Sequence, residues 1–196
     1  GERYSSALTN KNLKNNVILS YGENLGLKNE SLVYYGVNTK LINSTFDINQ
    51  NIKKKNNKLI IGHFSSNPNT KGSNTIIEAI NEMVDKYPDK FQYIGYKNNN
   101  FEKNVKEKVE HTKTWIDNIK RMYKCDIYIE TCKPYLNSYQ NFIEYNNTKF
   151  GEWGNTCLEA ASLGVIVISN TLTKDYYIKE YTNNYPLLIA NNKNDI

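Results

Sequence analysis

The sequence has no long hydrophobic run and no apolar leading segment. No stretch approaches the roughly 18 consecutive apolar residues that a membrane-spanning helix needs, so we expect no such helix. The first residues, Gly1-Glu2-Arg3-Tyr4, carry no apolar core of an export signal. These absences predict a cytoplasmic location and leave open a peripheral association with a membrane.

Cysteine is scarce, with only Cys125, Cys132 and Cys157 in the chain. An odd number without tight spacing argues against a disulfide framework and against a zinc cluster. We therefore expect three reduced thiols that serve as small core side chains. No pair of acidic residues at metal-binding spacing stands out either, so we predict no metal site.

A concentrated basic patch is also lacking. The chain carries 25 basic and 20 acidic side chains, a formal net charge of +5, but these charges are mixed along the sequence. The one dense basic run, residues 53–58, is typical of a solvated segment. No nucleic-acid-binding motif supports its alternative interpretation as a phosphate-backbone patch, so we predict no nucleic-acid partner.

From residue 59 onward, short apolar runs alternate with amphipathic segments, whereas residues 1–57 look polar and irregular. Continuous apolar strands between amphipathic helices indicate a parallel sheet covered on both faces. We therefore predict an α/β fold, a Rossmann-like doubly wound parallel sheet of about six strands. Asn74 is a suitable N-cap for the first helix, and Pro88 ends it. The expected strands are 59–64, 91–96, a short one near Val109, 126–130, 165–168 and 187–189, and the further helices are 115–123, 155–163 and 175–181.

Ligands of such sheets bind in the loops that follow the carboxyl ends of the strands. The loop at residues 65–72 precedes a helix, where backbone amides favour an anion, and Lys71 adds a charge that can reach a phosphate. The loop is neither a G-x-G-x-x-G fingerprint nor a Walker P-loop. Taken alone, the loop is more typical of an ordinary polar turn.

The segment 151–161 is the more informative loop. Gly154 allows a close approach of the backbone to a ligand, and Asn155 and Thr156 present donors at the start of a helix. Glu159, one turn into that helix, can accept hydrogen bonds from a vicinal diol such as a ribose, and Glu152 lies at the loop tip. The alternative is a capped helix with a favourable acidic residue near its N-terminus.

Three motifs together resemble the donor-binding half of GT-B glycosyltransferases, in particular the large retaining group that uses nucleotide sugars. They are Lys71-Gly72 after a strand, the segment from Gly154 to Ile168 with Leu158-Glu159-Ala160, and residues 33–40 at the entry to this half. The resemblance covers roughly residues 31–190. It implies a Rossmann-like donor-binding domain at residues 32–196, preceded by a lead-in segment or remnant of the preceding domain at residues 1–31.

The resemblance also implies roles for individual residues. Lys71 would neutralise the donor diphosphate and Glu152 would orient the sugar, which makes these two the expected catalytic residues. Glu159 would hold the ribose hydroxyls. The other expected substrate-binding residues are His63, Ser66, Gly72, His111, Thr112, Trp153, Gly154, Asn155 and Thr156, of which His111 and Thr112 would lie near the base. His63 and His111 are also compatible with purely structural roles.

Two positions depart from the family pattern. Where the family often has a Glu eight residues before the ribose-binding Glu159, this chain has Gly151, and the acid is displaced to Glu152. Where the family usually has an Arg five residues before the Lys, this chain has Ser66. A charge-assisted contact contributes about 1.5–3 kcal/mol, so donor affinity would fall unless another cation, with Lys133 and Lys149 as candidates, replaces that Arg.

The function that the resemblance implies is transfer of a sugar, as a hexosyltransferase does, from a nucleotide diphosphate sugar to an acceptor hydroxyl, with retention. UDP is the default carrier, the acceptor is an unidentified glycan, lipid or protein, and no cofactor is needed besides the nucleotide sugar as substrate. A GT-B enzyme has two Rossmann-like halves, so we expect this chain to lack the N-terminal half and to be inactive alone. The alternatives are a GT-B relative, such as a sugar epimerase or phosphorylase, and a non-catalytic binding module.

Overall fold

The computed structural model describes residues 18–21, 30–33, 37–46, 57–65, 68–96, 105–109, 114–132, 155–170, 187–190 and 192–196. The chain divides into two compact units. The first comprises residues 1–36, 134–154 and 170–185, and the second comprises residues 37–133, 155–169 and 186–196. In the first unit, β1 (Ile18–Tyr21) and β2 (Glu30–Val33) form a parallel pair.

The second unit is built on a sheet in which all neighbouring strands run parallel. The sheet order is β5-β4-β3-β6-β7-β8. Numbered along the chain within this sheet, that is the order 3-2-1-4-5-6 of doubly wound dinucleotide-binding folds. The sequence-based prediction of an α/β fold with a parallel sheet is confirmed. The strands are β3 (Leu59–His63), β4 (Phe91–Tyr96), β5 (Val105–Val109), β6 (Ile127–Thr131), β7 (Ile166–Ser169) and β8 (Leu188–Ile189).

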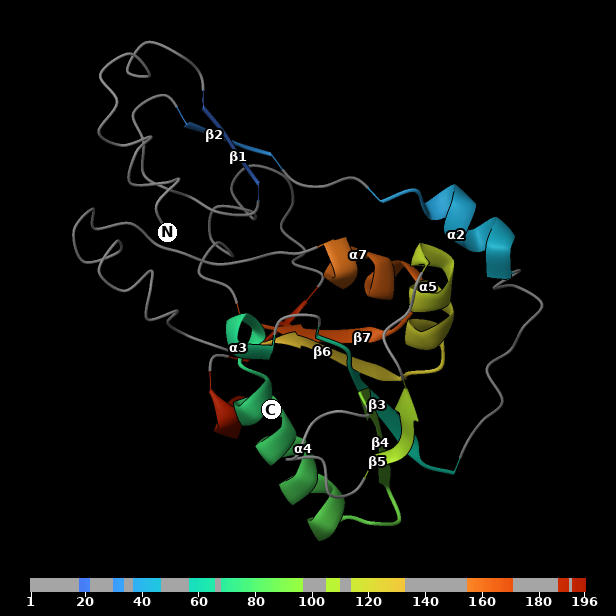
Figure 1. Ribbon diagram of the computed structural model, residues 1–196, viewed down its shortest axis with the longest axis vertical. Helices are drawn as coiled ribbons and strands as arrows, with labels where there is room; N and C mark the ends of the chain where they lie inside the picture. Colours follow the sequence, from blue (N-terminus) through green and yellow to red (C-terminus); the bar gives the residue numbers. More distant parts are fainter. Residues whose placement is uncertain are drawn as a thin grey trace. The chain divides into compact units, whose positions relative to one another are not determined.

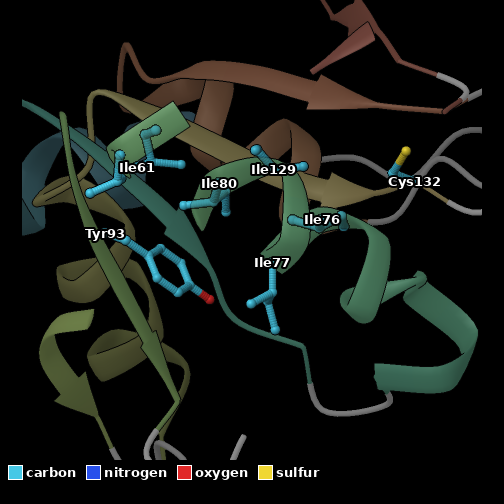
Figure 2. Close-up of a cluster of buried hydrophobic side chains, with 8 residues drawn as sticks. Ile61, Ile76, Ile77, Ile80, Tyr93, Ile129 and Cys132 are labelled. Carbon is cyan, nitrogen blue, oxygen red and sulfur yellow. The ribbon is translucent and has the colours of Figure 1, made fainter. Parts of the chain in front are cut away.

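Helices cover both faces of this sheet (Figure 1). Helix α4 (Ser73–Lys86) packs against β3, β4 and β6 on one face. On the other face, α7 (Asn155–Ser162) packs against β6 and β7, and α5 (Trp115–Tyr123) packs against α7. The core beneath α4 is a cluster of buried side chains, drawn in Figure 2, that includes Ile61, Ile76, Ile77, Ile80, Tyr93, Ile129 and Cys132.

The predicted start of the first helix is wrong by two residues, because its N-cap is Gly72 rather than Asn74, and the preceding loop contains a helix. Pro68 opens the four-residue helix α3 (Pro68–Lys71), consistent with the preference of proline for a first helical position. Gly72 then adopts a left-handed conformation with φ of 69° and is the N-cap of α4 in place of Asn74. A left-handed residue interrupts the helical backbone, and glycine adopts that conformation at little cost, so Gly72 separates the two helices.

Other differences lie near the ends of the chain. Helix α2 (Thr39–Phe46) falls in the segment expected to be irregular, and the Asn38 side chain caps it by accepting a hydrogen bond from the Leu41 amide at 3.0 Å. A short 3-10 helix, η2 (Lys193–Asp195), packs against α4. The helix expected at residues 175–181 lies outside the described residues.

All three cysteines are buried and carry thiols rather than disulfides. Cys132 belongs to the cluster beneath α4, and burial raises the pKa of its thiol to about 11. Within the described part of the chain, no helix is both long and apolar enough to cross a bilayer. Among the same residues, no group of three or more histidine, cysteine or acidic side chains is arranged to hold a metal ion.

Candidate functional site

The strand order places a topological switch point between β3 and β6. These strands are neighbours, with Gly62 paired to Tyr128, but the chain continues from β3 to β4 on one side and from β6 to β7 on the other. In doubly wound folds, ligands bind outside the carboxyl ends of the two strands that flank such a point. In this chain, β3 ends with His63 and β6 ends with Glu130 and Thr131, all three of which are buried.

His63 links the ends of both strands to the start of α4. Its Nδ1 lies 2.7 Å from the Ile129 carbonyl oxygen, and its Nε2 lies 2.7 Å from Ser73 Oγ. Since a carbonyl oxygen only accepts, Nδ1 carries the proton and Nε2 accepts a hydrogen bond from the Ser73 hydroxyl. Burial lowers the pKa of His63, which favours this neutral form.

This arrangement bears on two interpretations of His63. A serine hydroxyl within hydrogen-bond distance of a histidine is the geometry of an activated nucleophile, but Ser73 is 1% exposed and His63 is 3% exposed. The Ser73 hydroxyl is buried and already hydrogen-bonded to His63, so the pair has a structural role in this conformation. Contact between His63 and a substrate stays a prediction that would require one of the two hydrogen bonds to break.

Lys71 and Glu130 form an ion pair near the same carboxyl ends of β3 and β6. Lys71 Nζ lies 2.7 Å from Glu130 Oε1, and the two side chains are only 17% and 5% exposed. The other carboxylate oxygen, Oε2, accepts a hydrogen bond from the Tyr128 hydroxyl at 2.8 Å. Burial and the negative charge of Glu130 raise the pKa of Tyr128 well above its usual value, so this hydroxyl remains a donor at neutral pH.

The alternation of side chains along β6 explains how a charged residue is buried there. Ile127 and Ile129 pack in the cluster beneath α4, and because successive strand residues face opposite sides, Tyr128 and Glu130 face the other side of the sheet. The Tyr128 ring stacks on Phe64 with 5.9 Å between ring centroids. Apolar contacts therefore hold the strand, while Lys71 and Tyr128 satisfy the carboxylate.

Two further features lie at the carboxyl end of β6. The Cys132 amide donates a hydrogen bond to the Lys71 carbonyl oxygen at 3.0 Å, which fastens α3 to the end of β6. The Thr131 hydroxyl is buried and has no hydrogen-bond partner among the described residues. Since buried polar groups are nearly always satisfied, this hydroxyl is available to a ligand atom or to a group outside the described ranges.

Glu159 occupies a separate position on α7, where it is held by a tryptophan. The Trp115 indole N–H donates a hydrogen bond to Glu159 Oε1 at 2.6 Å, and Trp115 is 38% exposed. Trp115 is the first residue of α5, and the Thr114 side chain caps that helix by accepting a hydrogen bond from the Asp117 amide at 3.2 Å. Within the described part of the chain, Glu159 Oε2 has no hydrogen bond, which leaves this oxygen to accept one from a ligand hydroxyl.

The structure thus locates half of the expected site residues. His63, Lys71 and Gly72 come together at the carboxyl ends of β3 and β6. Asn155, Thr156 and Glu159 lie in the first turns of α7, which follows β6 in the chain. The other expected residues, Ser66, His111, Thr112, Glu152, Trp153 and Gly154, lie outside the described residues, as do Lys133 and Lys149.

Sequence reasoning did not identify Glu130, Tyr128 or Trp115 as functional candidates. For Glu130 a signal was available, because an acid that directly follows the apolar run 127–129 must be buried or lie at the strand end. The pairing of Trp115 with Glu159 joins two helices 44 residues apart in the chain. No local pattern marks such a contact.

No protein-family model matches the chain, and a search of curated proteins finds no significant match. The case for a function therefore rests on the chemistry of these residues and on the motif resemblance.

Proposed function

We propose that this chain is the donor-binding half of a GT-B glycosyltransferase and binds a nucleotide diphosphate sugar. The observation that carries the proposal is the placement of Lys71 and Glu159 in connections that follow β3 and β6, the two strands flanking the switch point. Nucleotide ligands of doubly wound folds bind at this place. The motif resemblance assigned the same two residues to the diphosphate and the ribose.

Each end of the donor would meet a suitable group. The Lys71 ammonium is a compact cation that can neutralise the diphosphate, with the backbone amides at the start of α4 beside it. Glu159 has one oxygen held by Trp115, so its remaining oxygen is oriented to accept a hydrogen bond from a ribose hydroxyl. The buried Thr131 hydroxyl, at the carboxyl end of β6, offers one further donor.

These contacts would serve a transfer reaction in which the nucleoside diphosphate leaves the anomeric carbon. Positive charge at Lys71 would stabilise the negative charge that develops on the leaving phosphate. Glu152, as the resemblance implies, would orient the sugar. The acceptor hydroxyl of a glycan, lipid or protein would be presented by a second Rossmann-like half, so this chain alone should bind donor and transfer no sugar.

The second candidate is a binding module of the same fold without transferase activity. The observation that favours it is the ion pair itself, because Glu130 already balances the charge of Lys71. Ser66, at the position where the family usually has an Arg, removes a second cation from this loop. Such a module would keep the sheet and lose affinity for the diphosphate.

Calorimetry with a panel of nucleotide sugars distinguishes the two candidates. We expect the chain to bind at least one of them, and we expect Glu159→Ala to weaken that binding by about 10- to 100-fold, since a hydrogen bond to a charged group contributes about 1.5–3 kcal/mol. Glu82→Ala is the matched control, because Glu82 is an exposed carboxylate on α4 that pairs with Lys193. Absence of binding at millimolar concentrations, or equal binding by the Glu159 variant, would contradict the donor-binding proposal.

A further inference from the structure

Glu130 holds the cation that the proposed donor would need. Its Oε1 lies 2.7 Å from Lys71 Nζ, and its side chain is 5% exposed. A bound diphosphate would bring a second anion to the same ammonium. Two anions sharing one cation in a water-poor site is unfavourable, because a buried charge that loses its partner carries a large desolvation cost. A bound diphosphate would therefore compete with Glu130 for the Lys71 ammonium.

We propose that Glu130 competes with the donor diphosphate for Lys71, and that donor binding is coupled to uptake of one proton by Glu130. The inference rests on the proposed function. When Lys71 Nζ turns to the phosphate, Glu130 Oε1 loses its cation and takes a proton from the solvent. The carboxylate becomes a neutral carboxylic acid, and no other bond is made or broken.

The groups that surround Glu130 favour its Oε1, rather than His63, as the atom that takes the proton. Tyr128 donates its hydroxyl hydrogen to Oε2, the oxygen that Lys71 does not contact, and this bond can persist when Oε1 is protonated. His63 is near enough to interact electrostatically, but its burial disfavours the charged imidazolium form. Among the described residues, Lys71 is the only cation paired with Glu130.

The remaining ionisable groups on this face do not replace Lys71. The thiols of Cys125 and Cys157 interact with the Tyr128 hydroxyl and carry no positive charge. Arg121 lies over the Phe64 ring, 4.3 Å from its centroid, and donates a hydrogen bond to Asn118 at 2.6 Å. A carboxylate that is buried without a cation is favoured in its neutral form, so Glu130 should be protonated in the donor complex.

The coupling predicts the direction in which donor affinity changes with pH. Because the complex holds one proton more than the free protein, donor affinity should rise as the pH falls. Replacing Glu130 with glutamine removes the competing charge and the proton acceptor together. Glu130→Gln should therefore bind donor about tenfold more tightly, the size expected for release of one charge-assisted contact, whereas loss of a merely structural residue would weaken binding.

Calorimetry on the whole chain tests the inference, with UDP-glucose, GDP-mannose and ADP-glucose as probes. These diphosphates are diesters and do not themselves titrate near neutral pH. Titrations at pH 7.5 in HEPES and in Tris, two buffers with different ionisation enthalpies, give the number of protons taken up on binding. We expect net proton uptake by the wild-type protein, none by Glu130→Gln, and uptake again by Tyr128→Phe, which keeps the ion pair and is the matched control.

The outcomes separate the inference from the function on which it rests. Binding by the wild-type protein without proton uptake, or weaker binding by Glu130→Gln, would overturn the inference and leave the proposed function standing. If no probe binds either protein at millimolar concentrations, the proposed function fails and the inference fails with it. Should Glu130→Gln not fold, the proton count of the wild-type protein and of Tyr128→Phe decides the question.

Discussion

Gly62 is the position in the sheet where an added methyl group should do most damage. It lies in β3, immediately before His63, and is buried. A Cβ atom at this position would clash with Cys125 Sγ and would lie 3.1 Å and 3.2 Å from two carbons of the Phe64 ring. Cys125 is fully buried and Phe64 is 6% exposed, so neither neighbour has open space into which it can move.

The expected cost of Gly62→Ala follows from these distances. Carbon and sulfur atoms pack at separations well above those found here, so the strand or Cys125 must shift. Inserting a methyl group into a filled core costs about 1–3 kcal/mol, and the closeness of the sulfur contact favours the upper half of that range. For a chain of this length, about 2–4 °C is lost per kcal/mol, which gives a fall in melting temperature of roughly 4–12 °C.

Chemical denaturation of four proteins measures this cost and identifies its cause. The variants are Gly62→Ala, Cys125→Ala and the double variant, alongside wild type. If the sulfur atom is the obstacle, Cys125→Ala should recover more than half of the stability that Gly62→Ala loses, a coupling energy of about 1–2 kcal/mol. A cost below about 0.5 kcal/mol, or costs that simply add, would refute the close packing of β3 against Cys125.

Three further perturbations address the site and its supports. Trp115→Phe keeps an aromatic ring but loses the N–H that holds Glu159; we expect calorimetry to show roughly three- to tenfold weaker nucleotide-sugar binding, and unchanged affinity would show that Trp115 does not position the carboxylate. The pKa of His63 is lowered by burial, so its stabilising contribution is complete above the unfolded pKa of about 6.5 and is lost as the pH falls from there toward the folded pKa. The stability advantage of the wild type over His63→Asn should therefore shrink below pH 6.5 by at most about 1.4 kcal/mol per pH unit, and parallel urea-denaturation curves between pH 7.5 and 5 would contradict this. Gly164 has φ of 72°, and a Cβ atom added there would meet no other atom within 4 Å, so Gly164→Ala should cost about 1 kcal/mol through backbone strain alone, with Gly164→Asn less affected in the same assay.

Most of the sheet was predictable because its strands, apart from the charged β5, are short and mainly apolar. The run at residues 165–168 has no polar interruption, as expected of a strand covered on both faces, and it forms β7 (Ile166–Ser169). Helix α5 was equally clear, because Ile119 and Met122 recur at helical spacing and are both fully buried. Local periodicity is sufficient for these elements, since the same residues determine the pattern and the packing.

The start of α4 was not predictable from capping preference alone. Asn74 is a good N-cap by residue type, but the chain turns at Gly72, whose left-handed conformation ends α3 and begins α4. Gly72 directly follows Lys71, whose carbonyl oxygen accepts a hydrogen bond from the Cys132 amide and so holds the end of α3 against the sheet. That contact joins segments far apart in sequence.

The pairings of the site residues were also not predictable from the sequence. The motifs singled out Lys71 and Glu159, but no sequence pattern indicated that Glu130 and Trp115 would pair with them. Both pairs form only when separate strands and helices meet. A residue type in a loop predicts what a side chain can do, whereas its charge balance depends on neighbours that the fold supplies.

The buried ion pair between Lys71 and Glu130 is weak evidence for a role in stability. Replacing such a pair with well-packed apolar side chains is often neutral or stabilising, because removing two charges from water costs about as much as their attraction returns. The cluster beneath α4 shows that this protein fills its interior with isoleucine where only packing matters. Charges at the carboxyl ends of β3 and β6 therefore need another explanation, and in doubly wound folds that is the place where ligands bind.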